Sequence, residues 1–331
     1  MIRDVLGEST LGDAYYRRLS QAVAHSGKGR ADGLVDIAML PSLTCQAGGG
    51  KFEAAMPVTD AWQMVRLAAK LLDDVEDGEA KDAPAETINL ATGLLFAAPL
   101  VLRGLLEQGF SGERILCLEE ALLRAELYAC AGQHSDLATG QSDIASMDPD
   151  TWLEIAQAKS GSLLGWATWA GALVAGADER ALSGYHAYGC HLGVLLQVAD
   201  DFKGVWSPGG VCDLAAGRPN LPVCYALHVA GEKERVHLET LLGQTVRGDR
   251  RAEAQAQQIL IDLGAQGYTL VAARVQHQLA VTALQRAGCI APTDKNLVAI
   301  LDRTIPALEL VSESYVAIET NAQEHTAPES P

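Results

Sequence analysis

The stretch that decides the fold covers residues 61–79 and reads AWQMVRLAAKLLDDVEDGE. Helical character in this stretch runs directly into a group of acidic residues. Asp73 and Asp77 are four residues apart, and Asp74 and Asp77 are three apart, so their carboxylates share one face of a helix. Glu76 is expected to face away from the other acids, as a surface charge.

Clustered carboxylates repel one another on a bare helix, so this cluster predicts either a compensating cation or a solvated acidic helix end. Mg2+ is the natural cation, because it is hard, takes oxygen ligands and is commonly shared between a few carboxylates and the phosphates of a substrate. The cluster alone leaves both interpretations open.

A second acidic cluster follows further along the chain. Gln197, Asp200 and Asp201 lie within one helical turn, after an apolar helical stretch. Two acidic helix ends in a chain of helices suggest a bundle whose cavity is capped by opposed carboxylates.

The bulk composition bounds the class of protein. The chain has 331 residues, of which 48% are hydrophobic, and a net charge of −17. It is long enough for a large core. The acidic balance argues against a nucleic-acid or anionic-membrane surface. An anionic substrate is still compatible, because a bound divalent metal reverses the local sign of a site.

Cysteine usage and targeting signals predict a cytoplasmic protein. The seven cysteines are scattered without close Cys or His pairing, which is typical of reduced thiols rather than disulfides or a zinc site. The start, MIRDVLGEST, lacks the apolar stretch of a secretion signal. The most apolar run, residues 94–102, is too short to span a bilayer and contains Pro99, so no integral membrane segment is expected.

The organisation along the chain reads as helix after helix, and no stretch alternates like a half-buried strand. Long helices are expected over residues 90–106, 111–132, 149–176, 180–206 and 252–288. Asp150 is a plausible helix start, with Asp148 as the alternative. We expect one helical domain over residues 1–319 and a polar, disordered tail over residues 320–331.

Six segments resemble, in order, the motifs of the trans-isoprenyl diphosphate synthases, also called polyprenyl synthetases. They are GGGK at 48–51, DDVED at 73–77, GQHSDL at 132–137, AKSGSLL at 158–164, QVADD at 197–201 and DLAAGRPNLPVCYAL at 213–227. DDVED matches the first aspartate-rich motif of the family, and QVADD matches the start of the second. One such match is weak evidence, whereas six in sequence order are strong evidence for the fold.

The resemblance implies an all-α, class I isoprenoid-synthase bundle around a deep apolar cavity, usually as a homodimer. It implies a diphosphate and about three Mg2+ ions at the cavity mouth. The implied metal ligands are Asp73, Asp74, Asp77, Asp200 and Asp201. The implied substrate contacts are Lys51, Arg66, Gln133, Lys159, Gln197 and Lys203. The implied catalytic residues are Asp73, Asp74, Lys159 and Asp200.

Such a site ionises an allylic isoprenoid diphosphate. Breaking the allylic C–O bond leaves a carbocation and inorganic diphosphate. Magnesium ions and lysines neutralise the charge that develops on the leaving group. An apolar cavity excludes water and protects the carbocation.

The basic residues of the family's second diphosphate site are partly missing. Phe52 stands where the family has arginine, and Arg66 stands where it usually has histidine. The arginine pair after the first motif is replaced by a segment in which Lys81 is the single base. The second motif ends in Gly204 rather than an acid. Asp213 is a candidate for the missing acid, with a helix cap or salt bridge as the alternative.

These departures leave three functions open. The one placed first is ionisation followed by cyclisation, quenching by water or transfer to an acceptor other than isopentenyl diphosphate, as in terpene synthases and related prenyltransferases. The second is true chain elongation with isopentenyl diphosphate. The third is a non-catalytic subunit of a heteromeric synthase. Ala68 and Ala69, just before the first motif, predict a long substrate by resemblance, with simple helix packing as the alternative.

Overall fold

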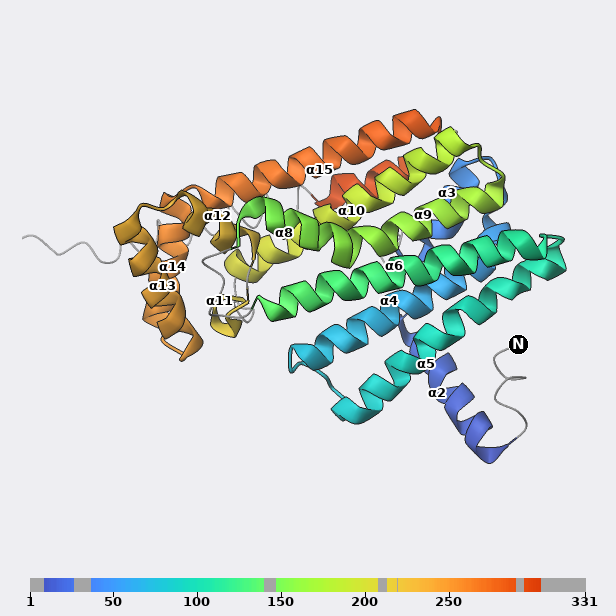
Figure 1. The fold of residues 1–331 in the computed structure, drawn as a ribbon, viewed down its shortest axis with the longest axis horizontal. Helices are drawn as coiled ribbons and strands as arrows, with labels where there is room; N and C mark the ends of the chain where they lie inside the picture. Colours follow the sequence, from blue (N-terminus) through green and yellow to red (C-terminus); the bar gives the residue numbers. More distant parts are fainter. Residues whose placement is uncertain are drawn as a thin grey trace, which may run out of the picture. The chain divides into compact units, whose positions relative to one another are not determined.

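The computed structural model describes residues 9–26, 37–139, 147–207, 213–218, 220–289 and 295–304. Every regular element in these ranges is a helix, as Figure 1 shows, which confirms the predicted all-α class. The predicted tail over residues 320–331 lies outside the described residues, as does Cys212.

The chain divides into two compact units. Unit 1 comprises residues 1–126, 165–189 and 283–300, and unit 2 comprises residues 127–164, 190–282 and 301–331. Five helical segments of the described chain contribute residues to both units: α6 (Gly112–Ala138), α9 (Ser162–Ala175), α10 (Glu179–Trp206), α15 (Ala265–Ala287) and the helical residues 295–304. A single domain over residues 1–319 stays a prediction.

Unit 1 also contains the helices of the N-terminal part of the chain. These are α2 (Thr10–Ser26), η1 (Ile37–Met39), α3 (Leu40–Ala47), η2 (Phe52–Ala55), α4 (Met56–Glu76), α5 (Pro84–Leu102) and η3 (Arg103–Gln108). Proline lies in the first turn of α4 and of α5, where its missing N–H has no helical partner to lose. Gly78 follows α4 with φ +72°, a conformation that stops the helix and turns the chain toward α5.

The core of unit 1 joins α2, α4 and α5. Ala68 of α4 is fully buried in one cluster with Leu19, Leu90, Ala91 and Leu94. Its small side chain lets the neighbouring helices approach closely, which favours helix packing as its role. The adjacent Ala69 is exposed.

Unit 2 also contains α8 (Pro149–Ala156), η5 (Gln157–Gly161), α11 (Asp213–Ala216), α12 (Leu221–Val229), α13 (Glu232–Val246) and α14 (Arg250–Asp262). The segment η5 is a π-helix inserted between α8 and α9. Such π-segments are rare and often occur at functional sites. The continuous helix predicted over residues 149–176 therefore has an irregular turn at its centre.

The structure selects one of the two predicted helix starts at α8, and it contradicts one predicted helix. Asp148, rather than Asp150, caps α8, and its carboxylate accepts a 2.7 Å hydrogen bond from the Thr151 N–H. The helix predicted over residues 252–288 is two helices, α14 and α15. Gly264 separates them with φ +81°, where a left-handed residue ends the helical ladder.

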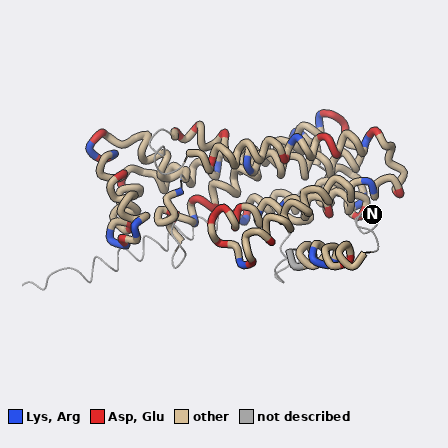
Figure 2. The backbone as a smooth tube through the Cα atoms, turned by 60° about the horizontal axis from the view of Figure 1, so that its bottom comes forward, with Lys and Arg blue, Asp and Glu red and all other residues tan. Residues whose placement is uncertain are grey.

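One described stretch, Pro84–Gln108, is long and apolar enough to cross a membrane by length and composition alone. It has a mean hydropathy of 1.6 over its most apolar window, and 39% of that window is buried. The sequence argument considered only the shorter run at residues 94–102. Charged residues are spread along the described helices, as Figure 2 shows.

Candidate active site

The first acidic cluster lies at the C-terminal end of α4 in unit 1. Asp73, Asp74 and Asp77 are half-buried, whereas Glu76 is exposed. This is the facing that the helical spacing predicts. Because α4 ends here, the negative end of its helix dipole lies beside the carboxylates, although the carbonyls of Asp73, Asp74 and Val75 accept backbone hydrogen bonds. The cluster is therefore more unfavourable without a cation than its sequence alone suggests.

Lys70 provides one cation for this cluster. Its Nζ lies 3.0 Å from Asp74 Oδ1, four residues along the same helix. The hydrogen bond to Asp74, followed by the charges of Asp74, Asp73 and Glu79, raises the pKa of Lys70, with burial acting against them. The Lys70 side chain is 67% exposed. Water therefore screens this ion pair, which offsets little of the repulsion among the three carboxylates.

Lys159 occupies the π-segment η5 in unit 2. Two glycines allow other helices to approach this segment very closely. A Cβ on Gly132 of α6 would lie 2.6 Å from the Lys159 backbone nitrogen, and a Cβ on Gly193 of α10 would lie 2.7 Å from Gly161 Cα. The π-segment therefore packs between two glycine positions, which fixes its backbone.

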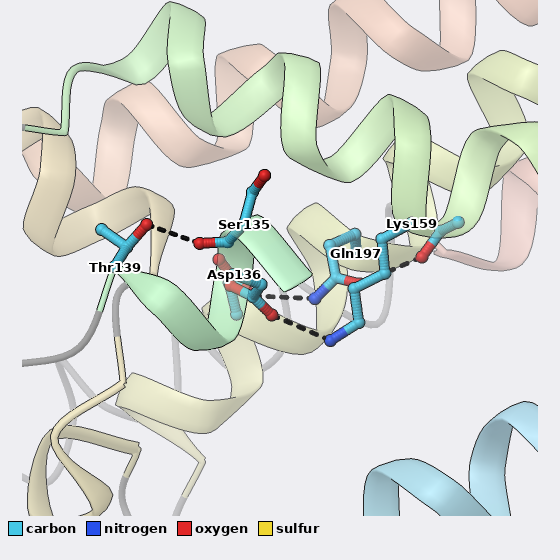
Figure 3. A network of polar contacts seen from close by, with 7 residues as sticks. Ser135, Asp136, Thr139, Lys159 and Gln197 are labelled. Atoms are coloured by element: carbon cyan, nitrogen blue, oxygen red, sulfur yellow. Dashed lines mark hydrogen bonds and ion pairs between the residues drawn. The ribbon is translucent and has the colours of Figure 1, made fainter. Parts of the chain in front are cut away.

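Asp136 orients the Lys159 side chain. The Lys159 Nζ lies 3.0 Å from Asp136 Oδ2, and the two side chains point toward one another in Figure 3. Both side chains are about three-quarters buried, at 23% and 26% exposure. An ion pair this shielded from water is stronger than a surface pair and restricts where the ammonium group lies.

Gln197 and Asp201 extend this network along α10. The Ser160 hydroxyl donates to Gln197 Oε1 at 3.1 Å, and Gln197 Nε2 donates to Asp201 Oδ1 at 3.2 Å. The Leu221 N–H donates to Asp201 Oδ2 at 2.7 Å. Both carboxylate oxygens of Asp201 thus accept hydrogen bonds within unit 2.

Burial raises the pKa of Asp201. Its residue is 7% exposed, and this burial is the main cause that raises its pKa to about 8. The hydrogen bonds from Leu221 and Gln197 oppose the shift, and the charges of Asp213 and Asp136 add to it. Asp200, the neighbouring acid, is exposed. A metal-binding role for both acids stays a prediction, and a cation on Asp201 has to compete with its protein donors.

The remaining predicted substrate contacts differ in exposure. Lys51 and Lys203 are exposed, and Gln133 is half-buried on α6, next to Gly132. Arg66 is half-buried on α4, and its Nε is a buried donor without a hydrogen-bond partner among the described residues. Unpaired buried donors are rare in folded proteins, so this guanidinium is suited to an anion.

The donor set fits magnesium in an open site. The acids offer oxygen atoms, which Mg2+ prefers. Within the described ranges, no three His, Cys, Asp or Glu side chains are grouped closely enough to hold a metal by themselves. Mg2+ commonly uses one or two carboxylates together with water and substrate phosphates. The chain therefore fits a metal that arrives with a diphosphate rather than one held in a protein cage.

Sequence reasoning missed three residues that position the predicted ones. Asp136 holds Lys159, Ser160 donates to Gln197, and Lys70 pairs with Asp74. Asp136 lies inside the quoted GQHSDL segment, so its place in that motif was the available signal. Lys70 was detectable from its spacing of four residues before Asp74. Nothing local in the sequence indicated the Ser160 contact.

Residues 37–260 match the protein-family model described as Polyprenyl synthetase. The chain is 32% identical over 203 residues to a geranylgeranyl diphosphate synthase of Mycobacterium tuberculosis, a stretch that covers 56% of each protein. It is 26% identical over 242 residues to a short chain isoprenyl diphosphate synthase of Methanothermobacter thermautotrophicus, covering 69% of this chain and 73% of that protein. A geranylfarnesyl diphosphate synthase of Aeropyrum pernix is 26% identical over 302 residues, covering 86% and 92%.

Solved structures agree on the fold. A polyprenyl synthetase from Streptomyces coelicolor A3(2) matches with a TM-score of 0.72 and 23% identity, covering 87% of this chain and 97% of that one. A geranylgeranyl pyrophosphate synthetase from Pyrococcus horikoshii Ot3 matches with a TM-score of 0.76 and 17% identity, covering 92% and 93%. At these identities the likeness shows the all-α isoprenoid synthase fold.

Proposed function

Because the chain belongs to the polyprenyl synthetase family, we propose that it is a trans-isoprenyl diphosphate synthase that extends an allylic diphosphate with isopentenyl diphosphate. The family match over residues 37–260 carries this proposal, because it includes both acidic clusters and Lys159. The similar proteins are named for isoprenyl diphosphate synthesis, and this supports elongation over the terpene-synthase-like function that the sequence placed first.

The acidic clusters bind the allylic diphosphate. Asp73, Asp74 and Asp77 would hold Mg2+, as would Asp200, and the metal would supply the positive charge that neutralises the diphosphate as the allylic C–O bond breaks. Lys159 donates to the same leaving group, and Asp136 keeps its ammonium group in place. The Ser160 hydroxyl donates a hydrogen bond to Gln197 and so positions its side chain in the same network.

The second substrate binds through the basic residues of unit 1. Lys51 and Arg66 contact the diphosphate of isopentenyl diphosphate, and the unpartnered Arg66 Nε supports this role. The double bond of that substrate attacks the allylic carbocation, a new C–C bond forms, and loss of one proton leaves a longer allylic diphosphate. Inorganic diphosphate is the other product, so atoms and charge balance.

We place the enzyme in the cytoplasm as a homodimer. The described cysteines are free thiols, which supports a reducing compartment.

Leu116 and Leu123 lie seven residues apart on one face of α6 and are 65% and 53% exposed. Apolar side chains exposed along one helix face are suited to an interface between two copies.

The test is incubation of the purified protein with Mg2+ and geranyl, farnesyl or geranylgeranyl diphosphate, each with and without labelled isopentenyl diphosphate. Elongation predicts a longer, labelled allylic diphosphate. Release of a hydrocarbon or alcohol from one allylic diphosphate alone would instead establish the terpene-synthase function. A protein that is inert alone and changes the products of a partner synthase would be a regulatory subunit.

A further inference from the structure

Gly93 of α5 leaves a gap that the Tyr15 hydroxyl of α2 fills. In a helix, a side chain covers the backbone turn that precedes it. Gly93 has no side chain, so the Asn89 carbonyl, four residues earlier, stays accessible, and the Tyr15 hydroxyl donates a 2.9 Å hydrogen bond to it. A Cβ on Gly93 would lie 2.0 Å from the hydroxyl oxygen. The contact therefore fixes where α2 lies along α5.

The same helix packs on α4 behind the first acidic cluster. Leu19 of α2 is 5% exposed and shares a buried cluster with Ala68 of α4. Leu71 and Leu72, which directly precede the acids, pack against that buried cluster. Ala68 and Asp77 are nine residues apart, about two and a half helical turns. Thus α2 packs on the face of α4 that is opposite the acids.

An ion pair joins α2 to the loop that follows the acids. Arg18 pairs with Asp82, which lies between the end of α4 and the start of α5. The side chains are 48% and 57% exposed, so water screens the pair and it adds little to the free energy of unfolding. Tyr15 and Arg18 are three residues apart and so lie on one face of α2. This face contacts both α5 and the loop after the acids.

We propose that α2 is a positioning element for the first acidic cluster, in which Tyr15 sets the register of α2 on α5 and Arg18 holds the loop after the acids. Three carboxylates that repel one another need support to keep one geometry, and metal ligands have to be held within about 0.5 Å of it. The inference rests on the proposed function, because it takes the cluster to bind a magnesium–diphosphate complex. Tyr15 and Arg18 act through α4 and its loop.

The first test measures the contact between Tyr15 and Gly93. Gly93→Ala forces the hydroxyl away from the Asn89 carbonyl, so we expect the thermal midpoint to fall by at least about 2 °C. In a Tyr15→Ala background the same change should be neutral or stabilising, because only the higher helix propensity of alanine remains. Gly112→Ala is the control, since a Cβ there would meet nothing within 4 Å. Equal effects in both backgrounds would overturn the contact.

The second test measures positioning, by calorimetric titration of Mg2+ in the presence of inorganic diphosphate. We expect Gly93→Ala to weaken Mg2+ binding at least about threefold. Leu105→Ala empties a fully buried position outside the cluster of Leu19 and Ala68, so it should lower the thermal midpoint and keep the wild-type Mg2+ affinity. Leu11→Ala, at an 84% exposed position of α2, should match the wild type in both measurements.

Arg18→Ala separates positioning from charge. Removal of a cation makes the field around the acids more negative, so charge alone predicts tighter Mg2+ binding. Loss of positioning predicts the opposite sign. We expect Arg18→Ala to weaken Mg2+ binding about twofold, within the range of an exposed ion pair. Tighter binding would overturn the role of Arg18.

The outcomes for this inference and for the proposed function are distinct. Wild-type Mg2+ affinity in a folded Gly93→Ala protein would overturn the inference and leave the proposed function intact. If Gly93→Ala does not fold, Tyr15→Phe decides in the same way, because it removes only the hydroxyl. A wild-type protein that binds no Mg2+ with diphosphate would overturn the magnesium part of the proposed function, and this inference with it.

Discussion

At the scale of single residues, the first acidic cluster combines two unfavourable features. Three carboxylates share one helix face, and they stand at the C-terminal end of α4, where the helix dipole is negative. Lys70 offsets only part of this charge from the helix surface. The cluster is therefore suited to bind a cation whose other ligands are water and substrate phosphates.

Removing either leading carboxylate should remove the ability to ionise the substrate. We expect Asp73→Asn and Asp74→Asn to lower the rate of Mg2+-dependent diphosphate release at least about 100-fold, because the developing charge on the leaving group loses its neutralisation. Glu76→Gln, an exposed acid beside the cluster in sequence, should retain near-wild-type rates. Near-normal activity of either aspartate variant would show that the metal assignment is wrong.

Glu126 gives the protein a pH-dependent stability. Burial raises the pKa of its carboxyl to about 7, and its Oε1 is buried without a hydrogen-bond partner among the described residues. The folded-state pKa lies above the value of 4.5 expected for the unfolded chain. The stabilisation from protonated Glu126 is therefore complete below that value and is lost as the pH rises through about 7.

Glu126→Gln should remove this dependence. Between pH 5 and pH 8 we expect the variant to gain stability relative to the wild type, on the order of 1 kcal/mol after allowance for partial exposure. Urea denaturation at several pH values measures this difference. Glu107→Gln, which changes an exposed acid of unit 1, is the control for this measurement. A constant difference between Glu126→Gln and wild type would contradict the prediction.

At the scale of elements, the π-segment η5 depends on glycines in the helices that pack on it. Gly132 of α6 and Gly193 of α10 bring backbones closer than any side chain allows. This contact places Lys159 and Ser160 beside Asp136 and Gln197. The geometry of the candidate diphosphate contact is thus a property of three packed elements.

A single methyl group should disturb this arrangement. Gly132→Ala places a Cβ 2.6 Å from a backbone nitrogen, which cannot move away as a flexible side chain would. We expect a loss of about 1–3 kcal/mol in the free energy of unfolding, together with weaker allylic diphosphate binding, because Lys159 is displaced. Gly267→Ala in α15 should be neutral, or stabilising by up to about 1 kcal/mol.

At the scale of the whole molecule, the prediction concerns the number of chains in the assembly. The exposed leucines of α6 predict that two copies associate. We expect light scattering of the wild type to give twice the chain mass of 35.0 kDa. Leu116→Asp/Leu123→Asp should shift the mass toward one copy, because charges in an apolar interface are costly. Monomeric wild type would refute the dimer, and Arg124→Ala on the same helix serves as a control.

Much of the fold was predictable because helices are read from local patterns. The sequence predicted the helical class, the approximate extent of α5, α6 and α10, and the shared face of Asp73, Asp74 and Asp77. It failed at Gly264, where a long helix breaks in two, and it left the cap of α8 open between Asp148 and Asp150. Isolated glycines are tolerated inside helices, so their sequence alone does not reveal which of them terminates one.

By itself, the sequence determined which residues of one helix act together, because the helical period places side chains three or four residues apart on the same face. The tertiary structure decided which residues of different elements meet. It brought Asp136 to Lys159 across 23 residues and Asp213 to Gly204. These contacts depend on how closely backbones pack, and that closeness is a property of the assembled core rather than of any one segment.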